Sequence, residues 1–190
     1  MKNFKALFVI LLSAFALPAL AEQFTVVGIM DGDTVKVLSS DHRQVKCRLH
    51  GVDAPEKSQS NGQKSKQALS DLIYRKIVDI QVVDQDRYGR SVCKISLAGR
   101  DINLEQVSTG MAWMYRQYNK DPLYDRAESS ARAKHLGLWA EANPTPPWDF
   151  RRAEKGQATN GAQGENRTAD RQREAQGLRS LTAMVRDLFR

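Results

Sequence analysis

The stretch DGDTVKVLSSDHRQVKCRLHGVDAPE, residues 31–56, decides how this chain is expected to fold. It opens with an Asp-Gly-Asp turn signal and continues into two apolar segments that alternate with polar residues, at 34–38 and 45–50. Such alternation is typical of strands with one buried face, and Asp-Gly is a frequent hairpin turn. Together with the β-branched segment at 24–29, the stretch predicts a meander of three strands.

In the chain after this meander, the spacing of the apolar residues changes. Residues 62–76 have helical spacing, and strand character returns at 77–83 and 91–97. A short helix is expected after Asn103, interpreted as its N-cap, and a longer helix over residues 121–135. This order of elements predicts a small closed β-barrel with helices packed outside it.

The longer helix carries its own start signals. Asp121 is the predicted N-cap, and Pro122 occupies the first helical position, where a missing N–H does no harm. An apolar stripe is expected to consist of Leu123, Ala127 and Ala131.

Residues 1–21 have the layout of a signal peptide. Lys2 and Lys5 precede an almost wholly apolar run at 6–17, and Ala19-Leu20-Ala21 has the small-residue pattern of a signal-peptidase site. The apolar run is short for a membrane span. We therefore predict cleavage after Ala21 and an exported mature chain, either periplasmic or secreted; a retained N-terminal anchor is the alternative.

Charge is distributed unevenly between a core domain, residues 22–150, and a predicted basic flexible tail, residues 151–190. The tail has nine Lys and Arg against five Asp and Glu, whereas the core has 18 against 17. Because the core is nearly neutral, its affinity for a polyanion must come from a few placed cations. The last dozen residues have the pattern of a basic amphipathic helix, which contacts a membrane surface or partner. The alternatives are a helix docked on its own domain and a partly disordered tail.

Five charged residues suit the hydrolysis of a phosphodiester when they are taken together, although each alone is more often structural. This reaction needs a cation on the phosphate, a base that activates water, and donors that stabilise growing negative charge. Asp33 and Asp53 are hard oxygen ligands for Ca²⁺ or Mg²⁺. Glu56 is a candidate base, and the planar guanidinium groups of Arg48 and Arg90 match phosphate oxygens.

The motifs around these residues resemble the thermonuclease, or staphylococcal nuclease-like, family over roughly residues 24–140. The motifs are Asp31-Gly32-Asp33-Thr34-Val35, Arg48-Leu49-x-Gly51-Val52-Asp53-Ala54-Pro55-Glu56 and Asp86-Arg87-Tyr88-Gly89-Arg90. The resemblance implies an α+β, mainly β fold: a five-stranded oligonucleotide-binding barrel with three helices. It further implies a Ca²⁺-dependent endonuclease that cuts DNA and RNA with little sequence specificity and leaves 3′-phosphates. We expect a monomer without a stable protein partner.

The resemblance also implies a role for each motif residue. The metal ligands would be the side chains of Asp33 and Asp53 and the carbonyl of Ala54, with Asp31 orienting a metal-bound water. Arg48 and Arg90 would contact the scissile phosphate, and Glu56 would act as general base. The nucleotide pocket would be lined by Arg87, Tyr88 and Tyr115.

Two cysteines, Cys47 and Cys93, lie in predicted strands. In an oxidising compartment such a pair suggests one disulfide, and two buried free cysteines are the alternative. If Arg48 and Arg90 both face the pocket, strand alternation points the two cysteines into the barrel, where they would meet.

A second function class stays open at this point. The same type of barrel can hold nucleic acid or protein without cutting it, so a non-catalytic binding module of the cell envelope is the alternative to an enzyme.

Overall fold

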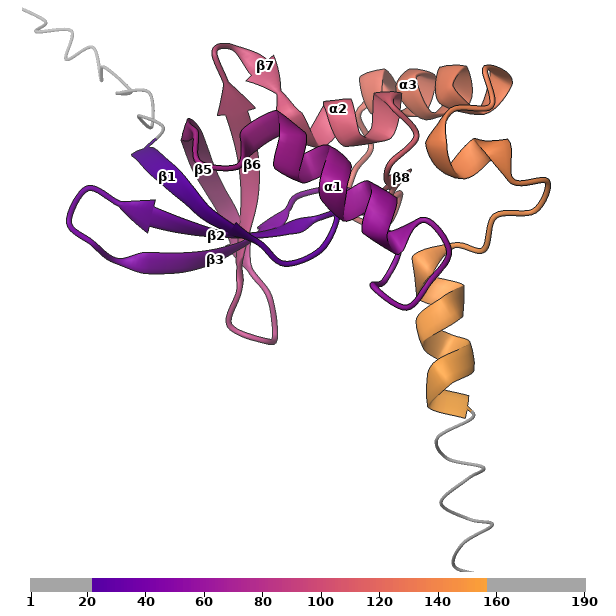
Figure 1. The fold of residues 1–190 in the computed structure, drawn as a ribbon, viewed down its shortest axis with the longest axis horizontal. Helices are drawn as coiled ribbons and strands as arrows, with labels where there is room; N and C mark the ends of the chain where they lie inside the picture. The colour runs from indigo at the N-terminus through magenta and orange to yellow at the C-terminus, as the bar shows by residue number, and fades with distance from the viewer. Residues whose placement is uncertain (1–21, 157–190) are drawn as a thin grey trace, which may run out of the picture.

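A closed five-stranded barrel forms the centre of the structure, a computed structural model that describes residues 22–156 (Figure 1). Its strands are β1 (Glu22–Ile29), β2 (Thr34–Ser39), β3 (Gln44–Leu49), β5 (Ile77–Gln85) and β6 (Ser91–Leu97). Antiparallel pairs run in the order β3-β2-β1-β5-β6, and a parallel pairing of β3 with β6 closes the barrel. The predicted barrel is therefore confirmed.

Short strands and helices surround this barrel. Strand β7 (Arg100–Asp101) extends the sheet beyond β6, and β4 (Val52–Asp53) pairs with β8 (Trp113–Met114) in a separate two-stranded sheet. The helices are α1 (Gly62–Ile73), α2 (Ile102–Ser108), α3 (Pro122–Ala133), the 3₁₀ turn η1 (Gly137–Ala140) and a final helix over residues 147–156. Helices α1, α2 and α3 lie together on one side of the barrel (Figure 1).

The final helix changes the expected domain boundary. The boundary predicted at residue 150 falls inside this helix, so residues 151–156 continue it and do not begin a flexible tail. The predicted signal peptide, residues 1–21, and the rest of the predicted tail, residues 157–190, lie outside the described residues. Within residues 22–156, no helix combines the length and the apolar character needed to cross a membrane.

The core consists of the inward faces of the strands and one face of α1. Val35 and Val37 of β2 alternate into the barrel and are fully buried, and Leu69 and Ile73 of α1, four residues apart, are buried in the same cluster. Full burial of a Val, Leu or Ile side chain contributes about 1.5–3 kcal/mol. The period-two and helical patterns of the sequence therefore converge on one core.

Helix α2 begins differently from the prediction. Its N-cap is Asp101, whose carboxylate accepts a hydrogen bond from a backbone N–H of the first turn, so the assignment of Asn103 as N-cap was wrong. Asn103 is instead fully buried. It accepts from the N–H of Ile95 (3.1 Å) and donates to the carbonyls of His50 and Cys93 (3.0 Å each). Asn103 thus joins α2 to β6 and to the chain that leaves β3.

Helix α3 confirms the predicted cap but corrects the predicted stripe. Asp121 caps it by accepting from the N–H of Leu123, and Pro122 is its first residue. The side chain of Leu123 is exposed, whereas Tyr124 and Glu128 are buried. The predicted stripe included only apolar residue types and therefore missed Tyr124 and Glu128. These two can be buried because the polar group of each has a hydrogen-bond partner.

A disulfide joins Cys47 of β3 to Cys93 of β6, with their Cα atoms 5.7 Å apart. Both cysteines are buried in the barrel. Because β3 and β6 are the two strands whose parallel pairing closes the barrel, the disulfide is a covalent bond across that closure.

Reduction of this disulfide is expected to lower the free energy of unfolding by about 2–5 kcal/mol, since the bond restricts an unfolded chain in which the cysteines are 46 residues apart. Urea unfolding with and without dithiothreitol measures the effect. The matched control is the Cys47→Ala/Cys93→Ala variant, whose unfolding midpoint should not respond to the reductant. Equal midpoints for the natural protein with and without reductant would contradict this role.

Candidate active site

The Asp-Gly-Asp turn between β1 and β2 is held from two helices. Asp31 accepts a hydrogen bond from the N–H of Asp33 (3.0 Å), and the buried Gln106 of α2 donates to the carbonyl of Gly32 (2.8 Å). A Cβ atom at Gly32 would overlap the hydroxyl of Ser65 on α1. Glycine is therefore required for α1 to approach this turn. The turn also holds Asp33, the residue that directly precedes β2.

The carboxylate of Asp33 is buried and hydrogen-bonded at both oxygens. Its Oδ2 accepts from the N–H of Ala54 (2.8 Å), and its Oδ1 accepts from the Thr34 hydroxyl (3.0 Å) and from Nη1 of Arg48 (2.8 Å). Burial raises the pKa of Asp33, and Arg48 and these hydrogen bonds oppose that rise. A buried carboxylate with this many donors is held in one orientation.

Arg48 connects Asp33 to a second buried carboxylate, Asp53. The arginine lies on β3 opposite Thr34, and its Nη2 donates to Oδ1 of Asp53 (2.7 Å). Asp53 lies in β4 and is fully buried. Burial alone would lower the pKa of Arg48, but the two carboxylates raise it above its ordinary value, so the guanidinium stays charged.

Glu56 is the more accessible carboxylate of the group. Its backbone N–H donates to the side chain of Gln59 (3.2 Å), and a Cβ atom at Gly62 would overlap its carbonyl oxygen. The loop is thus fixed while 36% of the glutamate side chain stays exposed. Exposure to water is what a residue that activates a water molecule needs.

Arg151, which sequence reasoning missed, joins Asp53 to Glu56. From helix 147–156 its Nη2 donates to Oδ2 of Asp53 (2.7 Å), and its Nη1 donates to Oε1 of Glu56 (2.7 Å) and to Oδ1 of Asp53 (3.2 Å). Burial opposes the charge of Arg151, but these carboxylates raise its pKa. The signal that could have found this helix is Trp148, because flexible segments rarely carry large aromatic residues.

Arg90 is placed apart from this cluster. Its Nε donates to Oδ2 of Asp86 (2.6 Å) within its own loop, and among residues 22–156 it makes no hydrogen bond to Asp33, Asp53 or Glu56. Arg90 ends the loop that leads into β6, the strand that pairs with β3 beside Arg48. The two arginines share no carboxylate partner among the described residues.

The predicted pocket residues are divided between two places. Arg87 and Tyr88 are exposed on the β5–β6 loop, where the Arg87 guanidinium lies 5.0 Å from the centre of the Tyr88 ring. Tyr115 follows β8 and stacks on Trp148, with ring centres 5.7 Å apart and planes at 7°. Beside this stack is a pocket of about 340 Å³ that Arg152 also lines.

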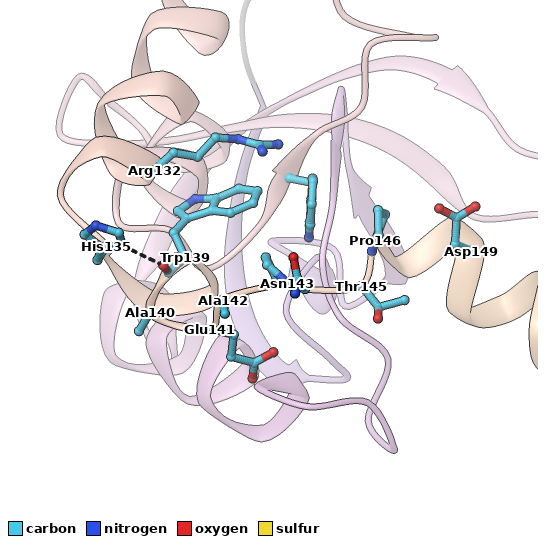
Figure 2. A pocket seen from close by; sticks show the side chains of 12 residues that line it. Arg132, His135, Trp139, Ala140, Glu141, Ala142, Asn143, Thr145, Pro146 and Asp149 are labelled. Atoms are coloured by element: carbon cyan, nitrogen blue, oxygen red, sulfur yellow. Dashed lines mark hydrogen bonds between the residues drawn. The ribbon is translucent and has the colours of Figure 1, made fainter.

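A larger pocket of about 860 Å³ lies beside η1 and the segment that follows it (Figure 2). Trp113, Trp139 and Arg132 line it, and the Arg132 guanidinium lies 3.8 Å from the centre of the Trp139 ring. The carboxylates of the candidate site do not line this pocket. Pocket size therefore does not mark the place where the acidic and basic side chains meet.

The cluster offers carboxylate oxygens, which are the ligands of hard metal ions. Within the described part of the chain, no group of three His, Cys, Asp or Glu side chains has an arrangement that could hold a metal. The donor chemistry still fits a hard divalent cation: Asp33 and Asp53 meet at one guanidinium, and Ca²⁺ takes carboxylate, carbonyl and water oxygens. Arg48 and Arg151 supply positive charge that pairs with the carboxylates.

Comparison with known proteins gives matches over most of the described residues. A family model described as "Staphylococcal nuclease homologue" matches residues 46–141. A Haemophilus influenzae protein named "Uncharacterized endonuclease" is 49% identical over 130 residues, 68% of this chain and 73% of its own. A Shigella flexneri protein named "Micrococcal nuclease" is 40% identical over 146 residues, 71% and 83% of the two chains. The segment matched by the family model includes Arg48, Asp53, Glu56 and Arg90.

Replacement of Arg48 by methionine is expected to lower the free energy of unfolding by about 3–5 kcal/mol, because it leaves the buried Asp33 and Asp53 with fewer compensating donors. Urea unfolding in the presence of a chelator measures the loss. The matched control is Arg87→Met, which removes an exposed guanidinium and should change stability by less than about 0.5 kcal/mol. If the two variants were equally stable, the carboxylates would not depend on Arg48.

Proposed function

Because the chain belongs to the staphylococcal nuclease family, we propose that it is a Ca²⁺-dependent endonuclease that cuts DNA and RNA with little sequence specificity and leaves 3′-phosphates. One observation carries this proposal. The Arg48 guanidinium joins two buried carboxylates, Asp33 and Asp53, while Glu56 lies next to them with an accessible carboxylate. Buried ionisable groups with a specific charged partner are candidates for a functional site.

The proposed roles follow from the chemistry of each group. Asp33, Asp53 and the Ala54 carbonyl would hold Ca²⁺, which when bound neutralises and orients the phosphate. Arg48 and Arg90 donate hydrogen bonds to the non-bridging phosphate oxygens, where negative charge grows during attack. Both are planar forks with permanent charge, so neither has to gain a proton for this role.

Glu56 acts on water. Its carboxylate takes a proton from a water molecule as the water oxygen attacks phosphorus. The bond between phosphorus and the 5′-oxygen of the next nucleotide then breaks, and the leaving oxygen takes a proton from a solvent water molecule to become a hydroxyl. The products are a 3′-phosphate and a 5′-hydroxyl.

Substrate contacts beyond the phosphate are proposed for Arg87, Tyr88 and Tyr115. Aromatic rings stack on bases of any type, and the Arg87 guanidinium attracts the backbone. Such contacts hold single-stranded or frayed nucleic acid without reading its sequence. They support low specificity.

Export is proposed from the layout of residues 1–21. The disulfide between Cys47 and Cys93 supports it, since disulfides persist in oxidising compartments.

The deciding experiment measures cleavage of fluorogenic DNA and RNA with Ca²⁺, with other divalent cations and with a chelator, followed by mapping of the product ends. Cleavage of both substrates that requires Ca²⁺ and yields 3′-phosphates is expected. Retained oligonucleotide binding without any metal-dependent cleavage would instead favour a non-catalytic binding module.

Replacement of Glu56 by glutamine is expected to slow turnover by about 10²–10⁴-fold, because an amide cannot accept the proton from water. Substrate affinity and the thermal midpoint should change little. The matched control is Asp71→Asn, the same exchange on the exposed face of α1. A Glu56→Gln protein with the turnover of the control would refute the role of this residue.

Replacement of Arg90 by lysine is expected to lower kcat/KM by about 10–100-fold, since a charge-assisted hydrogen bond contributes about 1.5–3 kcal/mol and an ammonium cannot form the planar fork. Steady-state kinetics on a short DNA substrate measures this. Arg126→Lys, on the exposed face of α3, is the matched control and should leave the kinetics unchanged. Full activity of the Arg90→Lys protein would remove Arg90 from the phosphate site.

A further inference from the structure

Arg151 lies beyond the segment that the family model matches, which ends at residue 141. It nevertheless contacts the two carboxylates on which the proposed reaction depends most, Asp53 and Glu56. Arg151 is therefore an active-site neighbour that the family motifs do not include.

The fold holds this arginine in place through several contacts of its own segment. Gln59 accepts from the N–H of Glu56 (3.2 Å) and donates to the carbonyl of Thr145 (2.6 Å), which ties the loop after β4 to the chain that enters helix 147–156. Trp148 then packs against Trp113, with ring centres 5.5 Å apart, and stacks on Tyr115. In Figure 1 the start of this helix, in light orange, lies beside the loop that precedes α1. The approach of Arg151 to the carboxylates is thus built into the fold.

The contacts of Arg151 use the oxygens that a cation would need. Oδ2 of Asp53 accepts from Arg151 alone among the described residues, and Oδ1 accepts from both Arg151 and Arg48. A divalent cation on Asp53 would therefore compete directly with Arg151. Its double positive charge would also repel the guanidinium at short range.

Of the two arginines, Arg151 is the one whose side chain can move away from Asp53. Arg48 is part of β3 at the closure of the barrel and its side chain is 18% exposed, whereas that of Arg151 is 33% exposed. Arg151 also lies on the last described helix, outside the barrel. Its side chain can turn away from Asp53 without opening the barrel.

A released Arg151 would face the substrate. The phosphate must lie within reach of both a cation on Asp53 and a water activated by Glu56, and Arg151 lies between these two carboxylates. Three carboxylates (Asp33, Asp53 and Glu56) and the three arginines assigned to the phosphate (Arg48, Arg90 and Arg151) carry no net formal charge. A divalent cation changes this to +2, which attracts the negatively charged phosphodiester.

We infer that Arg151 is a further substrate-binding residue of this nuclease: it holds Asp53 and Glu56 before the metal ion binds, and it donates to the substrate phosphate once Ca²⁺ has taken Asp53. The inference rests on the proposed function, because it takes Asp53 as a metal ligand. A planar guanidinium suits both states, since it pairs equally well with carboxylate and phosphate oxygens.

The test compares Arg151→Ala with Arg126→Ala, which removes the same charge from an exposed position of α3. Isothermal titration with Ca²⁺ alone, without substrate, is the first measurement. The Kd for Ca²⁺ is expected to fall about tenfold in Arg151→Ala, because the strong charge-assisted hydrogen bonds to Asp53 no longer compete. Arg126→Ala should lower it by less than about twofold, the effect of a distant screened charge.

The second measurement is the binding of thymidine 3′-monophosphate, which has a phosphate but no phosphodiester bond, at saturating Ca²⁺. Its affinity is expected to fall about tenfold in Arg151→Ala and to change little in Arg126→Ala. Arg151→Lys should shift both affinities in the same directions by smaller factors, and it serves as the test if the alanine variant does not fold.

The outcomes separate this inference from the proposed function. If neither the natural protein nor Arg151→Ala binds Ca²⁺, the proposed metal-dependent function is refuted. If both bind Ca²⁺ equally, or both bind the mononucleotide equally, only the role of Arg151 is refuted.

Discussion

Two buried carboxylates that share one guanidinium are the constraint on which the rest of this structure depends. Moving a charged carboxylate out of water costs several kcal/mol unless the charge is paired and its lone pairs are hydrogen-bonded. Asp33 and Asp53 meet that requirement through Arg48 and through the backbone N–H of Ala54. These donors come from different parts of the chain, so the burial of the two carboxylates depends on the turn after β1, strand β3 and strand β4 lying together.

The same strand that supplies Arg48 also closes the barrel. Successive side chains of β3 point to opposite faces, so Cys47 faces the core and its disulfide with Cys93 while Arg48 faces the carboxylates. The buried Asn103 adds hydrogen bonds at the same closure. A site placed at this point is therefore held by the most constrained part of the barrel, which is what a catalytic group needs for fixed geometry.

The sequence predicted those structural features that depend on neighbouring residues in the chain. It did not predict features that depend on tertiary packing. The alternating segments of β2 and β3 and the cap at Asp121 depend on neighbours in the chain and were predicted. Asp101 and Asn103 are both good cap residues two positions apart, and only the burial of Asn103 between β6 and α2 decides between them. Arg151 lies 98 positions from Asp53, and no local sequence pattern predicts a hydrogen bond between residues so far apart in the chain.

If the site takes a divalent cation, as we propose, it also has to be stable before the cation arrives. The barrel domain is nearly neutral, so unspecific positive charge does not compensate its buried carboxylates. Arg48 is the less exposed of the two arginines and contacts both Asp33 and Asp53. Arg151 is carried by a helix outside the barrel. On the role proposed for Arg151, one fixed and one exchangeable arginine would let the same carboxylates be stable in the free protein and available to a cation.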